Sequence, residues 1–374
     1  MRLVSVDSIH QGTKLAKPIY NDFGQSLINN DIELTNRMIQ RLKQLGITFV
    51  YINDNRTNDI NPKQAISIDL RKEAIKEIEY TFLEVKNPKQ FLKSSAFYEA
   101  SQRFKKIVNQ LLQELKSNKD LFTLLADIFS YEHHIFNHSL NVTMYSLAIG
   151  LELNLTNKEL ETIGIGALFH DIGKLMVPKN ILLKPGKLTY EEFEEVKKHT
   201  EYGFEALRKI DTIPLVAAHC AYQHHERIDG SGYPRGIKGN EIHYLARLIA
   251  VADVFDAVAS NRVYRKAMLP HEGLEILYAG SGTQFEKNIV EAFRKAVAIY
   301  PDGLGVVLSD GRKGIVAKQN PNSSDRPIIR ILEEKGQILT YPYDINLSKE
   351  LHIVIVDCEV RTFTSNKEKL IPKF

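Results

Sequence analysis

The sequence predicts a mainly α-helical protein with a central all-helical bundle, a small mixed unit before it and a small β-rich unit after it. Three observations lead to this fold class. Apolar residues recur at helical spacing from about 119 to 300, two capping patterns mark helix starts there, and short β-branched runs separated by turn residues follow Tyr300–Pro301. We expect four segments, at 1–60, 61–118, 119–300 and 301–374.

Composition is that of an ordinary globular protein and excludes several classes of function. The 374 residues include 49 basic and 46 acidic ones, and the net charge of +3 gives no sign of a nucleic-acid polymer as partner. No apolar run approaches the roughly 20 residues that span a bilayer, and the first residues lack the apolar core of a signal peptide. Cys220 and Cys358 lie far apart and form no disulfide framework. We therefore expect a cytoplasmic protein without a membrane partner.

Residues 1–60 are expected to form a small α+β unit. The apolar runs Leu15–Tyr20 and Gln25–Ile28 flank an Asn-Asp-Phe-Gly turn, which predicts a hairpin. Thr35 is placed to cap a short amphipathic helix, and the β-branched and aromatic residues at 47–52 predict a strand.

Residues 61–118 are expected to be a helical connector. Two Lys- and Glu-rich helices are predicted at roughly 66–86 and 95–116, with charged faces that are most simply solvated surface. Their apolar stripe consists of Ile75, Ile78, Phe82, Phe104, Ile107, Leu111 and Leu115.

The segment 119–300 begins with predicted helices at Asp120–Phe129 and His138–Leu151. Thr-Asn-Lys-Glu at 156–159 is a capping box that opens a helix ending at an adjacent His170–Asp171 pair. A second capping box, Thr-Tyr-Glu-Glu at 189–192, is expected to open a helix that carries His199.

Two further helices complete this segment. Pro214 fits the first turn of a helix that runs to about His225. Glycines mark 229–240 as a loop, and a long apolar helix at roughly 243–260 carries Asp253. After 301, the runs Gly-Val-Val-Leu, Gly-Ile-Val-Ala, Pro-Ile-Ile-Arg-Ile-Leu and His-Ile-Val-Ile-Val predict short strands.

Chemistry-bearing residues gather in the helical segment. Eight of the twelve histidines fall between His133 and His225. Candidate metal ligands, five imidazoles and two carboxylates, are His138, His170, Asp171, His199, His224, His225 and Asp253. Mixed nitrogen and oxygen donors suit Fe, Mn, Zn or Ni rather than Mg or Ca. Seven ligands that share the carboxylate of Asp171 would serve two ions, and such a pair suits attack by hydroxide on phosphorus.

Plainer interpretations stand beside this one. Any single histidine of the set is more often a packed or surface residue than a ligand, and His224–His225 also fits an exposed helix end. Asp253 is the least ordinary, because an acid inside an apolar helical run needs a partner.

Five motifs in order then carry a specific resemblance. Asn-His-Ser-Leu-Asn-Val (137–142), His-Asp-Ile-Gly-Lys (170–174), the stretch 198–207, His-His-Glu-Arg-Ile-Asp-Gly-Ser-Gly-Tyr-Pro (224–234) and the stretch 251–268 together resemble the HD-GYP domain, a branch of the HD phosphohydrolase superfamily. The resemblance covers about 130–275. It implies an all-α bundle, a metal centre of Fe, Mn or similar ions, and hydrolysis of cyclic di-GMP.

The resemblance also implies roles for individual residues. One ion would be held by His138, His170, Asp171 and Asp253, and the other by Asp171, His199, His224 and His225. Lys174 would lie over the scissile phosphate, with Asp171 as its catalytic neighbour. Gly232, Tyr233 and Pro234 form the signature loop beside the substrate, and Arg262 and Arg265 match basic positions that bind its phosphates. Relatives often have Lys at the second of these.

A third ion is where this sequence departs from some relatives. They use a Glu four residues before the first His ligand, whereas this chain has His134, which shares a helix face with His138 if the stretch is helical. We expect two tightly held ions and mainly the linear product pGpG, with slow conversion to GMP.

Two alternatives remain open, a non-catalytic cyclic di-GMP receptor or interaction module, and an HD phosphohydrolase acting on another cyclic dinucleotide such as cyclic GMP-AMP. A homodimer or a signalling-protein partner is compatible with either.

Overall fold

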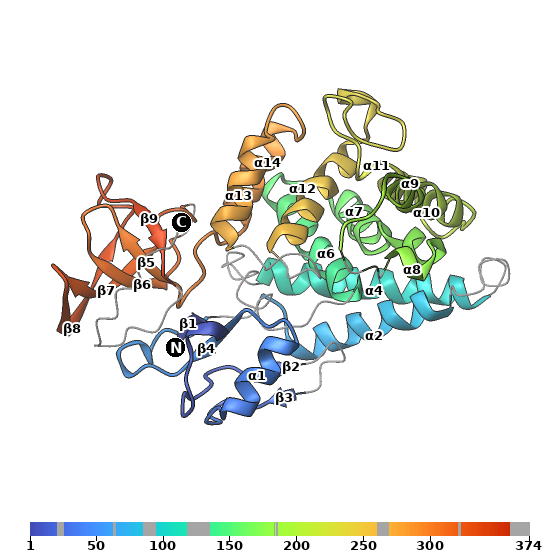
Figure 1. Cartoon of the computed structure of the whole chain (residues 1–374). Coiled ribbons are helices and arrows are strands. Elements are labelled where there is room, and N and C mark those ends of the chain that lie inside the picture. The colour runs from blue at the N-terminus through green and yellow to red at the C-terminus, as the bar shows by residue number, and fades with distance from the viewer. Residues whose placement is uncertain are drawn as a thin grey trace.

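The computed structural model of the chain describes residues 1–20, 26–62, 65–84, 95–117, 135–182, 184, 186–259, 269–320 and 323–359 (Figure 1). Within these residues the fold class predicted from the sequence is confirmed: helices form the centre of the molecule, and strands occur toward both ends of the chain. No helix in the described ranges combines the length and apolar character needed to cross a bilayer.

The first segment is a small mixed unit, as expected. β1 (Arg2–Ser5) pairs antiparallel with β4 (Phe49–Ile52), and β2 (Ile19–Tyr20) pairs with β3 (Ser26–Ile28). Thr35 accepts a hydrogen bond from the backbone N–H of Met38 and so caps α1 (Asn36–Gln44). The predicted pairing of two short strands is therefore confirmed, with shorter strands than the apolar runs predict, and the turn expected at 21–24 lies outside the described residues.

Two long helices lead from this unit to the bundle. α2 (Ile68–Glu84) and α4 (Ser95–Ser117) pack against each other and against the bundle. Their apolar stripe is buried at Ile75, Ile78, Phe104, Ile107, Leu111 and Leu115. The predicted helix at Asp120–Phe129 lies outside the described residues.

The bundle contains the most buried helices. They are α6 (Ile135–Glu152), α7 (Asn157–Phe169), α11 (Leu215–Gln223) and α12 (Tyr244–Ala259). Around them lie η4 (Ile172–Met176), α8 (Lys179–Leu182), α9 (Tyr190–Lys197), α10 (His199–Leu207), α13 (Pro270–Ala279) and α14 (Lys287–Ala296). Both predicted capping boxes are present, at Thr156–Glu159 and Thr189–Glu192. Because α12 is apolar on nearly all sides, it is buried at the centre of the bundle.

Among the helix boundaries that differ from the prediction, two concern predicted histidine ligands. The helix opened by Thr189 ends at Lys197, and His199 begins a separate helix, α10. The helix after Pro214 ends at Gln223, so His224 and His225 follow it rather than belong to it. Both boundaries place histidines at helix ends, where the backbone direction changes.

The last described segment is a five-stranded antiparallel sheet in the order β8-β7-β6-β5-β9. Its strands are β5 (Gly305–Leu308), β6 (Lys313–Lys318), β7 (Ile328–Glu334), β8 (Gln337–Asn346) and β9 (Ile355–Cys358). β8 was not predicted, and the last strand begins at Ile355, three residues after the start of the strand predicted at 352–356.

The first strands and the last sheet share one hydrophobic core, although about 250 to 300 residues separate them. Leu3, Phe49 and Tyr51 pack with residues of the sheet such as Val306 and Ile331. The backbone N–H of Leu3 donates to the carbonyl of Gly303 at 2.8 Å. Figure 1 shows β1 and β4 beside the C-terminal sheet. The boundaries predicted for the four segments stay a prediction, but the outer two segments are packed together.

Candidate metal centre

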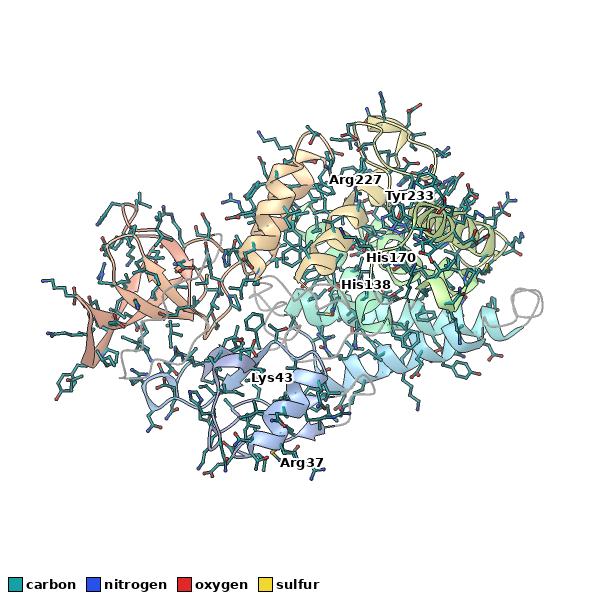
Figure 2. The ribbon with its side chains drawn as sticks, in the orientation of Figure 1. Arg37, Lys43, His138, His170, Arg227 and Tyr233 are labelled. Atoms are coloured by element: carbon teal, nitrogen blue, oxygen red, sulfur yellow. The ribbon has the colours of Figure 1, made fainter. Side chains whose placement is uncertain are left out.

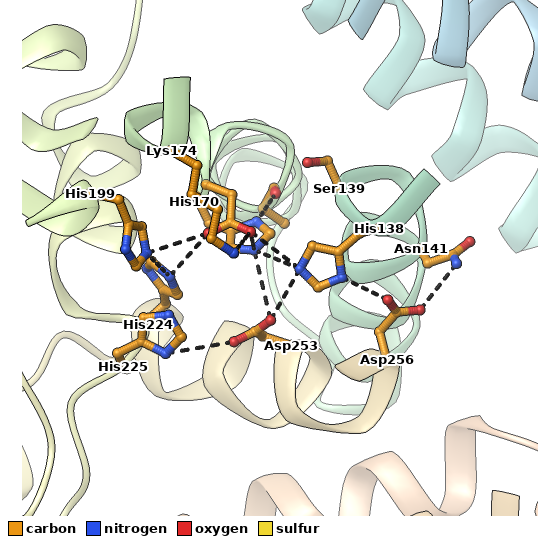
Figure 3. A network of polar contacts seen from close by, with 12 residues as sticks. His138, Ser139, Asn141, His170, Lys174, His199, His224, His225, Asp253 and Asp256 are labelled. Atoms are coloured by element: carbon orange, nitrogen blue, oxygen red, sulfur yellow. Dashed lines mark hydrogen bonds and ion pairs between the residues drawn. The ribbon is translucent and has the colours of Figure 1, made fainter. Parts of the chain in front are cut away.

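The predicted ligands come from five places in the bundle and meet at one point (Figure 3). His138 lies in α6, and His170 and Asp171 follow the end of α7. His199 is the first residue of α10. The remaining members are His224 and His225 after α11, and Asp253 in the middle of α12.

Asp171 lies between two groups of histidines. Its Oδ2 atom is 3.4 Å from Nε2 of His138 and 3.3 Å from Nε2 of His170. Its Oδ1 atom is 3.4 Å from Nε2 of His199 and 3.8 Å from Nε2 of His224. Two sets of donor atoms close enough to hold an ion therefore share this carboxylate, and His225 belongs to the second set.

Asp253 also faces histidines of both groups. Its Oδ1 atom is 3.2 Å from Nε2 of His138 and 3.8 Å from Nε2 of His170. Its Oδ2 atom is 3.8 Å from Nδ1 of His225. The partner that an acid in an apolar helix needs is thus supplied by three imidazoles.

Backbone carbonyls fix the tautomers of several rings. Nδ1 of His170 is 2.7 Å from the carbonyl of Ala167, Nδ1 of His199 is 2.6 Å from that of Val196, and Nδ1 of His224 is 3.0 Å from that of Ala221. Because a carbonyl only accepts, each Nδ1 carries the proton, and in a neutral ring Nε2 is left as a lone pair.

Protonation of these rings follows their surroundings. Burial lowers the pKa of His199 to about 4 and, with the charges of neighbouring histidines, holds the pKa values of His224 and His225 well below the ordinary value. Burial acts in the same direction on His138, but its contacts with Asp171, Asp253 and Asp256 raise its pKa overall. Neutral imidazoles are the form that binds a metal.

Both carboxylates are ionised. Burial opposes the charge of Asp171, yet the nearby charges of Lys174 and His170 hold its pKa well below the usual range. For Asp253, burial is likewise outweighed by His138 and His225. The centre therefore presents two carboxylates and several neutral imidazoles.

These donors fit a divalent cation. Nε2 of His199 and Nε2 of His224 face each other at 3.4 Å, and two lone pairs at that distance repel unless a cation lies between them. Oδ1 of Asp171 points to the same place, is buried, and has no hydrogen-bond partner among the described residues. A buried unpaired carboxylate oxygen is costly, so this arrangement is that of a site for divalent metal.

Two residues that support the centre, Asp256 and Asn141, were not among the predicted site residues. Asp256 Oδ2 is 2.6 Å from Nδ1 of His138, and Asp256 Oδ1 accepts a 3.0 Å hydrogen bond from Nδ2 of Asn141. The signal was present, because Asp256 follows Asp253 and Asn141 follows His138 at a spacing of three residues on the same helices. Carboxylates behind ligating histidines orient the ring and raise its basicity.

A close approach of backbones brings Asp171 to His199. A Cβ atom on Gly173 would lie 1.9 Å from the carbonyl oxygen of His199 and 2.6 Å from the backbone N of Gly203. Only glycine therefore allows η4 to lie directly against α10. This close packing explains why the His-Asp-Ile-Gly-Lys motif has a glycine at position 173.

The signature loop folds back on the end of α11. A Cβ on Gly232 would lie 2.4 Å from the carbonyl oxygen of His225, and the N–H of Tyr233 donates to that carbonyl at 3.2 Å. The Tyr233 ring stacks on the His225 ring with centroids 4.6 Å apart. The buried carboxylate of Glu226 accepts from the N–H of Arg235, which directly follows Pro234. Tyr233 and His170 are both labelled in the helical part of the molecule in Figure 2.

The remaining predicted residues divide into two cases. Lys174 is described: its Nζ donates to Oδ2 of Asp171 at 2.5 Å, and a fifth of its side chain is exposed (19%). His134, Arg262 and Arg265 lie outside the described residues, so their predicted roles have no structural account here.

Fold and site together define a helical metal-binding domain with a histidine–aspartate centre. Residues 90–289, more than half of the chain, match the family model described as "HD domain", and residues 305–365 match "KOW domain associated with HD domain". The chain therefore belongs to the HD domain family, and the recognition made from its motifs is confirmed.

Curated relatives share this part of the chain. The chain is 34% identical to "Cyclic di-GMP phosphodiesterase PA4108" of Pseudomonas aeruginosa over 60% of this chain and 54% of that protein. It is 40% identical to "Cyclic di-GMP phosphodiesterase" of Thermotoga maritima over 47% and 48%. It is 38% identical to "3'3'-cGAMP-specific phosphodiesterase 3" of Vibrio cholerae over 44% and 36%. The match thus spans about half the length of the first two relatives and about a third of the length of the third.

Proposed function

We propose that this protein is a metal-dependent phosphodiesterase that hydrolyses cyclic di-GMP to pGpG. The observation that carries the proposal is the position of Asp171, whose two carboxylate oxygens face separate histidine groups. The names of the Pseudomonas and Thermotoga relatives support the choice of substrate.

We propose that two ions bind. His138, His170, Asp171 and Asp253 would hold one, and Asp171, His199, His224 and His225 the other. The mixed nitrogen and oxygen donors favour a transition-metal ion over Mg or Ca. The resemblance to HD-GYP domains favours Fe or Mn, with Zn or Ni as further candidates. When bound, such ions lower the pKa of water and neutralise charge on phosphate oxygens.

The chain's own residues would bind and orient the substrate. Lys174 already directs its ammonium group at the centre, where it can donate to an oxygen of the scissile phosphate. Tyr233, held on His225 by the loop, forms one wall. Arg262 and Arg265 are proposed, from the sequence alone, to bind the phosphates.

The test is hydrolysis by the full chain loaded with Fe(II) or with Mn(II). The expected result is metal-dependent release of pGpG, with GMP following slowly, and two ions per chain after loosely held metal is removed. His352→Ala, at an exposed histidine away from the centre, is the control and should behave as wild type. Tight binding of cyclic di-GMP without hydrolysis, by protein with full metal content, would favour the receptor alternative.

A second substrate needs the same assay, because one relative is named as specific for 3'3'-cGAMP. The ratio of kcat/KM for the two cyclic dinucleotides decides between them. The number of ions is tested separately. Three tightly bound ions, or GMP formed as fast as pGpG, would contradict the two-ion proposal. If His134 faces the metals, His134→Glu should raise the occupancy of a third metal site. The cytoplasmic location and any homodimer or signalling partner also stay part of the proposal.

A further inference from the structure

An exposed aromatic ring lies next to the metal centre and has no role in the centre itself. Phe193 in α9 has 43% of its surface exposed. Its ring meets the ring of Tyr233 edge to face, with centroids 6.2 Å apart. Tyr233 in turn stacks on His225, so Phe193 is two ring contacts away from a predicted ligand.

A cation accompanies this ring. Nζ of Lys197 lies 5.0 Å from the centroid of Phe193 and 5.6 Å from that of Tyr233. It also pairs with Glu194 at 2.6 Å, and 27% of the Lys197 side chain is exposed. We call Phe193, Lys197 and Tyr233 together the aromatic surface.

The helix that carries Phe193 is fixed relative to the centre. The reciprocal capping box of Thr189 and Glu192 holds its start, and Glu192 also pairs with Lys184 at 2.7 Å. Its end passes through Lys198 directly into His199, which faces Asp171. The Phe193 ring is therefore held in place rather than carried on a loose loop.

We propose that Phe193 stacks one nucleobase of the dinucleotide whose phosphate lies at the metal centre. This inference rests on the proposed function. A purine is a flat, weakly hydrated ring, and an exposed aromatic face is the group on which proteins stack bases without need of sequence-specific hydrogen bonds. Lys197 braces the ring and adds positive charge beside a substrate that carries two phosphates.

If Phe193 binds the base and the metal centre binds the phosphate, two ligands that differ only in the base should respond differently to a change at Phe193. GMP and ribose 5-phosphate carry the same phosphate, but only GMP has a base. Their binding to the metal-loaded full chain is measured by calorimetry or as competition with the substrate. Phe193→Ala should weaken GMP binding and raise the KM for cyclic di-GMP by about tenfold, the lower part of the range for loss of base stacking. Binding of ribose 5-phosphate should not change, and Phe193→Tyr should restore the affinity for GMP.

Two neighbouring lysines provide a matched control. Lys197 and Lys198 each pair with the glutamate three residues before them, but of the two only Lys197 has a described contact with the rings. Lys197→Ala should weaken GMP binding, whereas Lys198→Ala should not. Metal content and melting temperature, measured for each variant, show that the fold and the centre are kept.

The outcomes distinguish this inference from the proposed function. If the wild type hydrolyses neither cyclic dinucleotide, the proposed function fails, and the difference between GMP and ribose 5-phosphate still tests the aromatic surface. The inference is overturned if Phe193→Ala leaves GMP binding unchanged, if it weakens both ligands equally, or if the wild type binds GMP no better than ribose 5-phosphate.

Discussion

Asp256 contacts the ring nitrogen of His138 that points away from the centre: Oδ2 of Asp256 is 2.6 Å from Nδ1 of His138. The other nitrogen of that ring, Nε2, faces Asp171 and Asp253. The carboxylate of Asp256 is almost fully buried and is itself held by Asn141. A ring restrained in this way presents a fixed lone pair to the centre when a metal binds.

We therefore expect Asp256→Ala to lower metal affinity by about 10- to 100-fold, the usual effect of removing a carboxylate behind a ligating histidine. The measurement is titration against a competing chelator. Asp211→Ala, at an exposed carboxylate, is the control. Unchanged affinity in a folded Asp256→Ala protein would show that the ring is oriented without this contact.

Asp171→Ala should reduce both bound metal and turnover to background. Asp171 belongs to both sets of donor atoms, and the methyl group of alanine offers no oxygen to either set. Metal analysis and hydrolysis are measured on the same folded sample. Wild-type turnover with full metal content would rule out the bridging role.

Lys174→Ala should keep its metal but lose turnover by about 10²-fold, since a protonated amine cannot ligate but can stabilise charge on phosphate. Arg262→Ala, chosen from the sequence alone, should behave similarly. Lys179→Ala, at an exposed lysine five residues later, is the control. Loss of metal with retained substrate affinity would contradict the assigned role of Lys174.

Gly173→Ala should destabilise the bundle by about 3 kcal/mol and displace His199, because the added methyl group meets backbone atoms that cannot move aside cheaply. Gly203→Ala provides the contrast. Its Cβ would make only an ordinary 3.4 Å contact with Ala221, so a neutral or slightly stabilising effect is expected within a helix. Denaturant unfolding and metal content of both variants are compared, and equal stabilities would refute the packing argument.

The first strands offer a prediction about pH. Burial acts to raise the pKa of Asp54, but hydrogen bonds from Arg56 and the charges of Arg56 and Arg2 lower it overall. A carboxylate whose pKa is lowered by folding contributes stability at pH values above its pKa in the unfolded chain, near 3.8. That contribution is lost as the pH falls through the lower pKa of the folded protein. Asp54→Asn should therefore destabilise β1 and β4 by about 1–2 kcal/mol near pH 7 and by much less near pH 3. The measurement is hydrogen exchange of the backbone amides of β1 and β4 in the variant and the wild type at each pH. An equal loss of protection at the two pH values would contradict the prediction.

Local patterns predicted the parts of the molecule that depend on local chemistry. The caps at Thr156 and Thr189 were predicted correctly from residue spacing, and so was the buried stripe between Ile75 and Leu115, apart from Phe82, whose side chain lies outside the described part of the structure. The seven candidate ligands are brought together, although their roles as ligands stay a prediction. Asp256 was not predicted, because it contacts the outward-facing Nδ1 of His138, and such support depends on how α6 and α12 pack together.

Other features leave little local signal. β8 carries exposed side chains, among them Ile338 and Tyr341, so it lacks the buried apolar run by which the other strands were recognised. The break at Lys198 has no proline or glycine to mark it; it is consistent with the packing of α10 on η4, made possible by Gly173. Pairing between Leu3 and the sheet spans nearly the whole chain and cannot be read from any short window.

That long-range pairing has a consequence for how the protein is made. During translation, Leu3 and Tyr51 leave the ribosome about 250 residues or more before Leu304 and Val306, which complete their hydrophobic core. The helical domain can form in the interval from contacts that are closer in sequence, while one face of the β1–β4 pair waits uncovered. The order of events expected in the newly made chain is thus bundle first and the joined outer segments last, and the interval before residue 304 appears is when chaperone binding to the first strands is most needed.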